Sequence, residues 1–302
     1  MTKIASSIGE AGSPSRKGGE DVTGYGEIVI AAILWSLAGI FAKQIQGMSA
    51  ESITFYRVLF ALVIFFIFIL ISGNLRIIEL KDKKIYLLLF GILQAGTMLT
   101  FFISLLKGSV SIAVLLLYTA PVYIAILSPW LLKEKSTKKG IVALVLSILG
   151  ILFIVDPGKL DLAPIGILAG IASGIIYAFQ IMISKYTSST YSGYAQAFWS
   201  FPVAIIILLP AGTAPFNVVI DNLGYLILLA IFPTIMAVSL YFNGLKKVNA
   251  HSASIVGLIE PLSAIILSVL ILHEQISILE IIGGALILAG VSLVIRDEPL
   301  YS

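Results

Sequence analysis

The sequence predicts an all-α integral membrane protein of ten transmembrane helices, arranged as two inverted five-helix repeats around a central cavity. Three observations predict this class. The chain is 59% hydrophobic and 12% charged over 302 residues, whereas a soluble domain carries about 25% charged residues. Its apolar residues form ten segments close to the ~20 residues that a membrane-spanning helix needs. The second half of the chain also repeats the first, about 140 positions later.

The repeat is clearest around two prolines. Pro121 in LYTAPVYIAILSPWLLKEK recurs as Pro261 in GLIEPLSAIILSVLILHEQ, and at the same offset Glu134 matches Glu274. Lysines cluster at 133–139 after the first copy, whereas the loop after the second copy has none. Positive loops stay on the cytoplasmic side of a membrane, so one copy should be inverted relative to the other. Inverted repeats in an apolar chain are typical of alternating-access transporters.

The segments divide the chain into four parts. Residues 1–24 are rich in Ser and Gly and predict a disordered cytoplasmic tail. Residues 25–155 hold the first repeat, 156–163 a linker, and 164–296 the second, inverted repeat. The predicted helices cover residues 25–43, 50–72, 84–106, 109–132, 138–155, 164–185, 191–210, 222–245, 250–272 and 277–295.

The distribution of basic residues predicts the orientation. With the N-terminus in the cytoplasm, 15 of the 19 Lys and Arg residues fall on the cytoplasmic side and 3 outside, and Arg57 lies within a helix. The positive-inside rule therefore predicts a multi-pass protein of the inner, cytoplasmic membrane with both termini in the cytoplasm.

Several function classes are disfavoured by what the sequence lacks. It has no cysteine, and its two histidines show no metal-ligand spacing, so neither a metal site nor a cofactor is expected. There is no phosphate-binding GxxxxGK[ST] run and no nucleophile–base set, so the chain is not expected to be an enzyme. The lysines lie in short loops, which reports topology and not nucleic-acid binding.

Glu260 is the sharpest candidate for chemistry. It lies near the middle of the predicted helix 250–272, where a charge costs at least about 2.5 kcal/mol unless it faces protein or water. The matching residue in the first repeat is Ala120, so the fold does not require an acid there. Glu260 either contacts a substrate amine or acts as a protonation switch, or it is a structural carboxylate beside Pro261. The functional interpretation is the default for an ionisable residue inside the membrane.

Aromatic and amide side chains also lie at membrane depth, and Trp35 and Tyr177 occupy matching positions in the two repeats. Small-molecule sites are largely apolar and aromatic with a few polar groups. The set therefore predicts a lined cavity, although each aromatic alone is more typical of packing. The candidate substrate-binding or coupling residues are Glu260, Trp35, Gln94, Tyr118, Tyr177, Gln180, Tyr241 and Asn243.

Pro121 and Pro261 each remove a backbone donor in mid-helix, which frees the carbonyls of Leu117 and Gly257. Such carbonyls are tolerated at membrane depth where they line a cavity or find another partner. The two prolines are therefore candidate hinges, with a static kink as the alternative. Arg57 either extends to the membrane surface or pairs with a carboxylate or a helix C-terminus.

Two further patterns are interpreted as structural. Glu134 and Glu274 each precede a helix, whose positive N-terminal end favours a carboxylate. Gly166, Gly170 and Gly174 are spaced by four and predict a face on which another helix packs closely.

These motifs together resemble the EamA family of the drug/metabolite transporter superfamily. The likeness rests on Trp35 in AILWSLAGIFAK, Arg57 in ITFYRVLFA, and the paired segments APVYIAILSPWLLKE and IEPLSAIILSVLILHE, and it covers about residues 27–295. The resemblance implies an inverted-repeat fold with a central cavity, and movement of small metabolites, often export of amino acids or related compounds. Related branches carry nucleotide sugars and phosphorylated sugars, but this chain lacks the intramembrane Lys/Arg cluster that a phosphate needs.

We therefore expect a secondary transporter that moves a small metabolite by alternating access, with export as the expected direction. A passive channel or facilitator, and a transporter of sugar phosphates or nucleotide sugars, remain alternatives. The expected partners are a small-molecule substrate, protons as a candidate coupling ion, and the lipid bilayer. The chain is expected to be a monomer or a homodimer.

Overall fold

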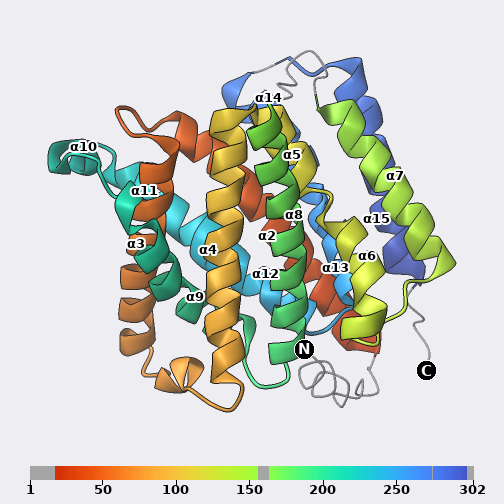
Figure 1. The fold of residues 1–302 in the computed structure, drawn as a ribbon, viewed down its shortest axis with the longest axis horizontal. Helices are drawn as coiled ribbons and strands as arrows, with labels where there is room; N and C mark the ends of the chain where they lie inside the picture. The colour runs from red at the N-terminus through yellow and green to blue at the C-terminus, as the bar shows by residue number, and fades with distance from the viewer. Residues whose placement is uncertain (1–17, 156–162, 274, 298–302) are drawn as a thin grey trace.

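A computed structural model describes residues 18–155, 163–273 and 275–297 (Figure 1). These residues form helices and connecting loops without any β-strand. The predicted tail lies largely outside the described residues, as does the linker, but helix α2 begins at Gly18, seven residues before the predicted start. The main helices are α2 Gly18–Lys43, α3 Ala50–Ile71, α4 Lys84–Lys107, α5 Val110–Leu117, α6 Ala120–Leu131, α7 Lys138–Ile154, α8 Pro164–Thr187, α9 Gly193–Leu208, α10 Phe216–Asp221, α11 Leu223–Leu229, α12 Ala237–Leu245, α13 Ala250–Gly257, α14 Ile259–Leu272 and α15 Ile278–Asp297.

Nine helical stretches among the described residues are long and apolar enough to cross a membrane. They correspond to nine of the ten predicted segments. The remaining segment forms α7, an apolar helix of 17 residues. At 1.5 Å per residue, α7 is about 25 Å long, slightly less than the ~30 Å hydrocarbon core. The structure therefore confirms a multi-pass helical membrane protein.

The fourth and ninth predicted segments are each interrupted halfway. The first breaks between α5 and α6, just before Pro121, and the second breaks between α13 and α14, just before Pro261. Proline has no backbone N–H to donate to the carbonyl four residues earlier, and it is tolerated in the first turn of a helix, which explains why a new helix begins just before each proline. Each segment is thus a pair of half-helices that meet near the middle of the membrane.

A third proline produces a different irregularity. Pro233 lies in the short π-helical stretch Ala230–Met236, between α11 and α12. A proline leaves the carbonyl four residues earlier without its helical donor. Here that carbonyl belongs to Leu229, and the Thr234 hydroxyl donates to it at 2.8 Å. The segment therefore crosses the membrane without a break, because a side chain replaces the missing backbone donor.

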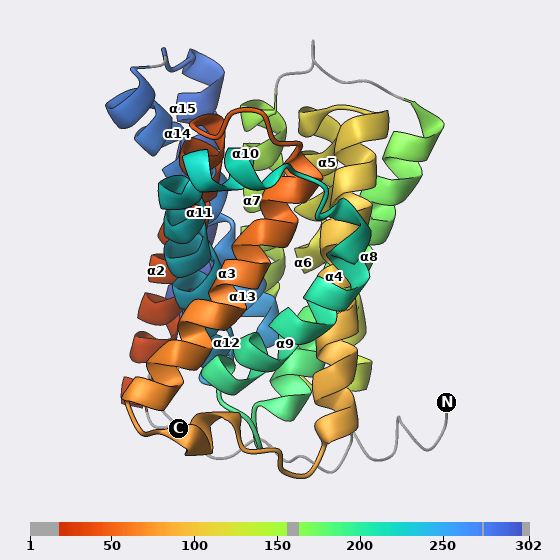
Figure 2. The ribbon, with the colours of Figure 1, turned by 90° about the vertical axis from the view of Figure 1, so that its left-hand side faces the viewer.

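The helices that surround the centre form two groups. We call α4, α5, α6 and α8 the α4–α8 bundle, since these helices pack on one another. We call α2, α11, α12, α13 and α14 the α2–α12 bundle, which is arranged around α2. Figure 2 shows the α4–α8 bundle on the right and most of the α2–α12 bundle on the left. Each bundle mixes helices from both halves of the sequence, so the packing units do not coincide with the sequence halves.

The predicted glycine face of α8 does pack closely. A Cβ atom at Gly170 would lie 2.6 Å from Leu116 Cδ1, and one at Gly174 would lie 2.5 Å from the Leu116 carbonyl oxygen. These glycines allow α5 to lie directly on α8. The interpretation of this face as a packing surface is confirmed.

Helices α7 and α15 form a peripheral pair on the right of Figure 1. Their closest approach is at Gly150 and Gly283. A Cβ at Gly150 would lie 2.6 Å from the Gly283 carbonyl oxygen, and a Cβ at Gly283 would lie 2.5 Å from the Gly150 carbonyl oxygen. Neither backbone can move aside as a flexible side chain could, so the pair requires glycine at both positions.

We expect Gly283→Ala to lower the free energy of unfolding by about 1–3 kcal/mol, the usual penalty for overpacking. The matched control is Gly39→Ala, where no atom lies within 4 Å of the new Cβ. Alanine favours a helix over glycine, so this control is expected to be neutral or to stabilise by up to about 1 kcal/mol. Thermal unfolding of both proteins in detergent measures the difference, and equal melting temperatures would contradict the prediction.

Candidate functional site

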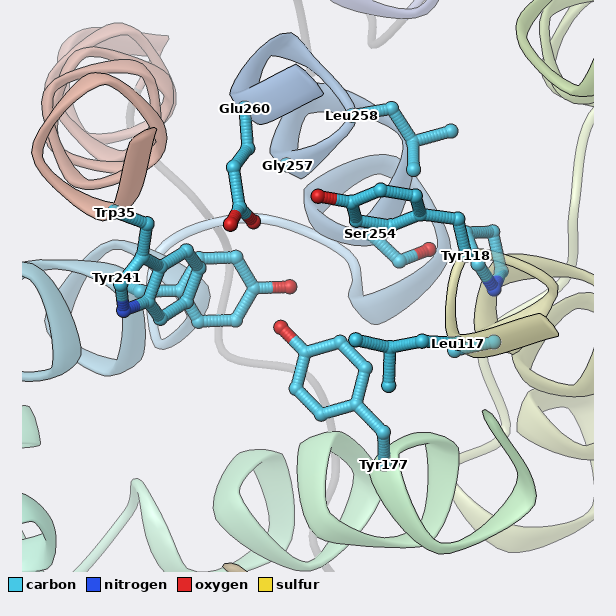
Figure 3. A pocket seen from close by; sticks show the side chains of 11 residues that line it. Trp35, Leu117, Tyr118, Tyr177, Tyr241, Ser254, Gly257, Leu258 and Glu260 are labelled. Atoms are coloured by element: carbon cyan, nitrogen blue, oxygen red, sulfur yellow. The ribbon is translucent and has the colours of Figure 1, made fainter. Parts of the chain in front are cut away.

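A small cavity lies between the two bundles, at the level of the two helix breaks (Figure 3). The α4–α8 bundle contributes residues next to the first break and one tyrosine of α8. The α2–α12 bundle contributes residues next to the second break, one tryptophan of α2 and one tyrosine of α12. The lining residues are Trp35, Leu117, Tyr118, Ala120, Pro121, Tyr177, Tyr241, Ser254, Gly257, Leu258 and Glu260.

The helix breaks explain how polar groups reach this depth. Tyr118 directly follows the last residue of α5, and Glu260 is the second residue of α14. Unpaired N–H groups give a helix N-terminus a partial positive charge, which favours a carboxylate in the first turn. The break before Pro261 therefore creates an internal helix N-terminus that stabilises the Glu260 carboxylate inside the membrane.

The carboxylate of Glu260 points into the cavity (Figure 3). The Tyr118 hydroxyl points toward it from the opposite bundle (Figure 3). The positive charge of Arg57 also acts on Glu260. The Arg57 Nε is buried and has no hydrogen-bond partner in the described part of the chain. Within the described residues, no carboxylate forms an ion pair with Arg57, so its role stays a prediction.

Four aromatic side chains line the cavity with Glu260: Trp35, Tyr118, Tyr177 and Tyr241. The rings of Trp35 and Tyr241 lie 4.9 Å apart at 43°. The hydroxyl groups of Tyr177 and Tyr241 face the same part of the cavity (Figure 3). In Figure 3, the hydroxyls of Tyr118, Tyr177 and Tyr241 all point toward the centre, where the Glu260 carboxylate ends.

This arrangement can accept hydrogen bonds from a cation. Glu260 is the charged residue among the described residues that line the cavity, and no Lys, Arg or His is among them. Carboxylate and hydroxyl oxygens accept hydrogen bonds from an ammonium group, and the electron-rich faces of aromatic rings also attract cations. Within the described residues, no group of three or more His, Asp or Glu side chains could hold a metal ion.

The structure brings together five of the eight predicted binding residues: Glu260, Trp35, Tyr118, Tyr177 and Tyr241. Pro121 also lines the cavity, and Pro261 is adjacent to Glu260 on α14.

The three predicted amides lie elsewhere. Gln180 donates a hydrogen bond to Gln94 across the interface of α4 and α8, where both side chains are buried. Asn243 donates to the Glu27 carboxylate at 2.9 Å, near the end of α12. A buried amide needs a partner, and here the partners are other protein groups and not the cavity.

Other lining residues were not among the predicted ones. Ser254 lies on α13, and Gly257 and Leu258 lie at the break that follows. Their proximity to Pro261 is the signal that could have indicated them, because a helix break exposes the residues on both sides of it.

The fold defines a class of protein: a multi-pass helical membrane protein with an internal cavity between two helix bundles. The chain belongs to the EamA-like transporter family, whose model matches residues 22–156 and again 164–296. The two matches agree with the internal repeat. The family lies within the drug/metabolite transporter superfamily.

Individual relatives support the same assignment. An uncharacterized transporter of Archaeoglobus fulgidus is 31% identical over 279 residues, covering 90% of this chain and 97% of its own. The uncharacterized inner membrane transporter YicL of Salmonella typhimurium is 30% identical over 289 residues, covering 90% and 94%. One crystal structure matches with a TM-score of 0.77 over 92% of this chain and 96% of its own. At 16% identity, this last match shows the fold alone.

Proposed function

We propose that the protein is a secondary transporter that exports a small metabolite bearing an ammonium group, such as an amino acid or a related compound, by alternating access. Glu260 holds the ammonium group, with the Tyr118, Tyr177 and Tyr241 hydroxyls as further acceptors. The single observation that carries the proposal is the cavity between the bundles, into which one carboxylate points and which no basic side chain lines.

The same cavity is a poor match for the alternative substrates. A sugar phosphate or nucleotide sugar would bring at least one negative charge next to Glu260. Without a lining cation, two anions in a cavity of low dielectric constant would repel each other strongly. Broken helices beside a midplane site are typical of carriers with repeated halves. We therefore also propose that α7 makes a tenth crossing of the membrane and that the two halves of the chain are inverted repeats. Pro121 and Pro261 are the proposed hinges.

A ligand screen tests the substrate class. A ligand that binds the native state raises its melting temperature. We expect amines and amino acids to stabilise the purified protein, and sugar phosphates and nucleosides to leave the melting temperature unchanged. Counterflow in proteoliposomes then separates a carrier from a channel. When the vesicles are loaded with unlabelled substrate, only a carrier transiently accumulates labelled substrate inside them. Stabilisation by sugar phosphates alone would overturn the proposal.

The predicted orientation has its own test. Lys135 and Gln275 are exposed at opposite ends of the bundle, and the native chain has no cysteine. We expect an impermeant thiol reagent to label Lys135→Cys only from the cytoplasmic side and Gln275→Cys only from the other side. Labelling of both variants from one side would contradict the inverted repeat.

A further inference from the structure

The two bundles are packed together at one end of the cavity and apart at the other. Half-helices α6 and α13 pack on each other, at the end that the positive-inside rule places in the cytoplasm. Their continuations diverge, because α5 packs on α4 and α8 whereas α14 packs on α2 and α15. In Figure 2, α6 and α13 lie close together, while α5 and α14 lie on opposite sides. The molecule is therefore closed at its predicted cytoplasmic end.

A lysine of one bundle contacts the end of a helix of the other at this closed end. Lys185 lies in the last turn of α8. Its Nζ donates to the backbone carbonyls of Leu245 at 2.8 Å, Lys246 at 3.3 Å, and Val248. These carbonyls belong to the C-terminus of α12 and the turn after it. The C-terminus of a helix carries a partial negative charge, so it attracts an ammonium group.

A glutamate of the same bundle contacts the start of the next helix. The Glu134 Oε2 accepts a hydrogen bond from the Ala250 backbone N–H, the first of α13, at 2.7 Å. The structure thus places the Glu134 carboxylate at the N-terminus of α13. The Glu134 backbone is itself held by Ser128, which accepts from its N–H at 3.3 Å. Glu274 lies outside the described residues.

The two side chains also attract each other. Lys185 Nζ lies 3.7 Å from Glu134 Oε1, and the side chains are only 10% and 14% exposed. Removing one member of a buried ion pair leaves the other charge poorly compensated, so such contacts matter far more than those on the surface. Lys185 and Glu134 belong to the α4–α8 bundle, while the backbone groups that they contact belong to the α2–α12 bundle.

We propose that Lys185 and Glu134 form a cytoplasmic latch, which holds the bundles together by binding the two opposite helix ends of the α12–α13 turn. The latch must open before the cavity can face the cytoplasm, since α6 and α13 cannot separate while it is formed. It biases the resting transporter toward the state that is closed on the cytoplasmic side. This assignment goes beyond the proposed substrate and does not depend on it.

A cysteine in the cavity reports which side is open. Leu117 lines the cavity and is partly exposed, so Leu117→Cys can be alkylated there. The labelling rate is compared between right-side-out and inside-out membrane vesicles. We expect an impermeant reagent to reach this cysteine faster from the outer side. Lys185→Met and Glu134→Gln should each raise the labelling rate from the cytoplasmic side about tenfold, the shift expected when a charge-assisted hydrogen bond is lost in one of two states. Lys246→Met, an exposed neighbour, should leave both rates unchanged.

A charge exchange separates the latch from a simple salt bridge. The double variant Lys185→Glu/Glu134→Lys restores opposite charges but places each next to the helix end of its own sign. We expect it to label from the cytoplasmic side as fast as the single variants. If the double variant labels from the cytoplasmic side as slowly as the native pair does, the contact is an ordinary ion pair and the latch proposal is wrong. Native labelling in folded Glu134→Gln, the mildest change, would also overturn it, whichever substrate the protein carries.

Discussion

Glu260→Gln is expected to reduce transport about 10- to 100-fold while the protein still folds and inserts. Glutamine keeps the size of the side chain and an acceptor oxygen, but it removes the charge that attracts the substrate. A hydrogen bond to a charged group contributes about 1.5–3 kcal/mol, which corresponds to this loss of affinity. The measurement is substrate flux in proteoliposomes, together with the melting temperature with and without ligand.

The matched control for this variant is Glu280→Gln. Glu280 also lies in the first turn of its helix, α15, but it is only partly buried, does not line the cavity, and accepts a hydrogen bond from the Ser277 N–H. Its replacement should leave flux unchanged. If Glu260→Gln transports at the native rate across pH 5–8, the residue is a structural carboxylate and the substrate must be held by the aromatic residues alone.

Arg57→Met should lower the free energy of unfolding by about 1–3 kcal/mol, because it removes the positive charge that acts on Glu260. Methionine keeps the unbranched apolar stem of the side chain, so part of the packing is retained when the charge is lost. Thermal unfolding of the purified protein gives the change in stability.

Combining Arg57→Met with Glu260→Gln distinguishes stability from function. The two changes together leave no unbalanced charge, so the double variant should regain most of the lost stability. It should still fail to transport, since the group that binds the substrate is missing. Additive losses of stability in the double variant would show that Arg57 and Glu260 do not interact.

The sequence predicted the fold well because membrane helices obey simple rules. Every backbone polar group must be satisfied inside lipid, so a run of about 20 apolar residues forms a helix whatever surrounds it. The helix breaks could be anticipated from Pro121 and Pro261 for the same reason. The π-helical stretch around Pro233 could not, because it depends on Thr234 reaching the carbonyl of Leu229.

The sequence predicts the position of a site residue well when its charge restricts where it can lie. It predicts the position poorly when helix packing determines it. A carboxylate at the middle of the membrane, Glu260, must face protein or water, and the structure places it in the cavity. An amide gives no such signal, and Gln94 and Gln180 satisfy each other between two helices. In the sequence, Lys185 was one of the basic residues that predicted which side of the protein faces the cytoplasm. Its contacts with α12 depend on a bundle arrangement that the repeat alone does not specify.

The pairing of α7 with α15 has a consequence for how the protein is made. Helix α7 lies near the middle of the sequence and α15 near its C-terminal end, and their contact at Gly150 and Gly283 holds the pair together. At about 5–20 residues per second, α7 leaves the ribosome on the order of ten seconds before α15 exists. Until then this short helix is in the bilayer without its main neighbour. Biogenesis therefore ends with the last helix docking onto α7, and a chain truncated before α15 would leave a glycine-lined surface exposed to lipid.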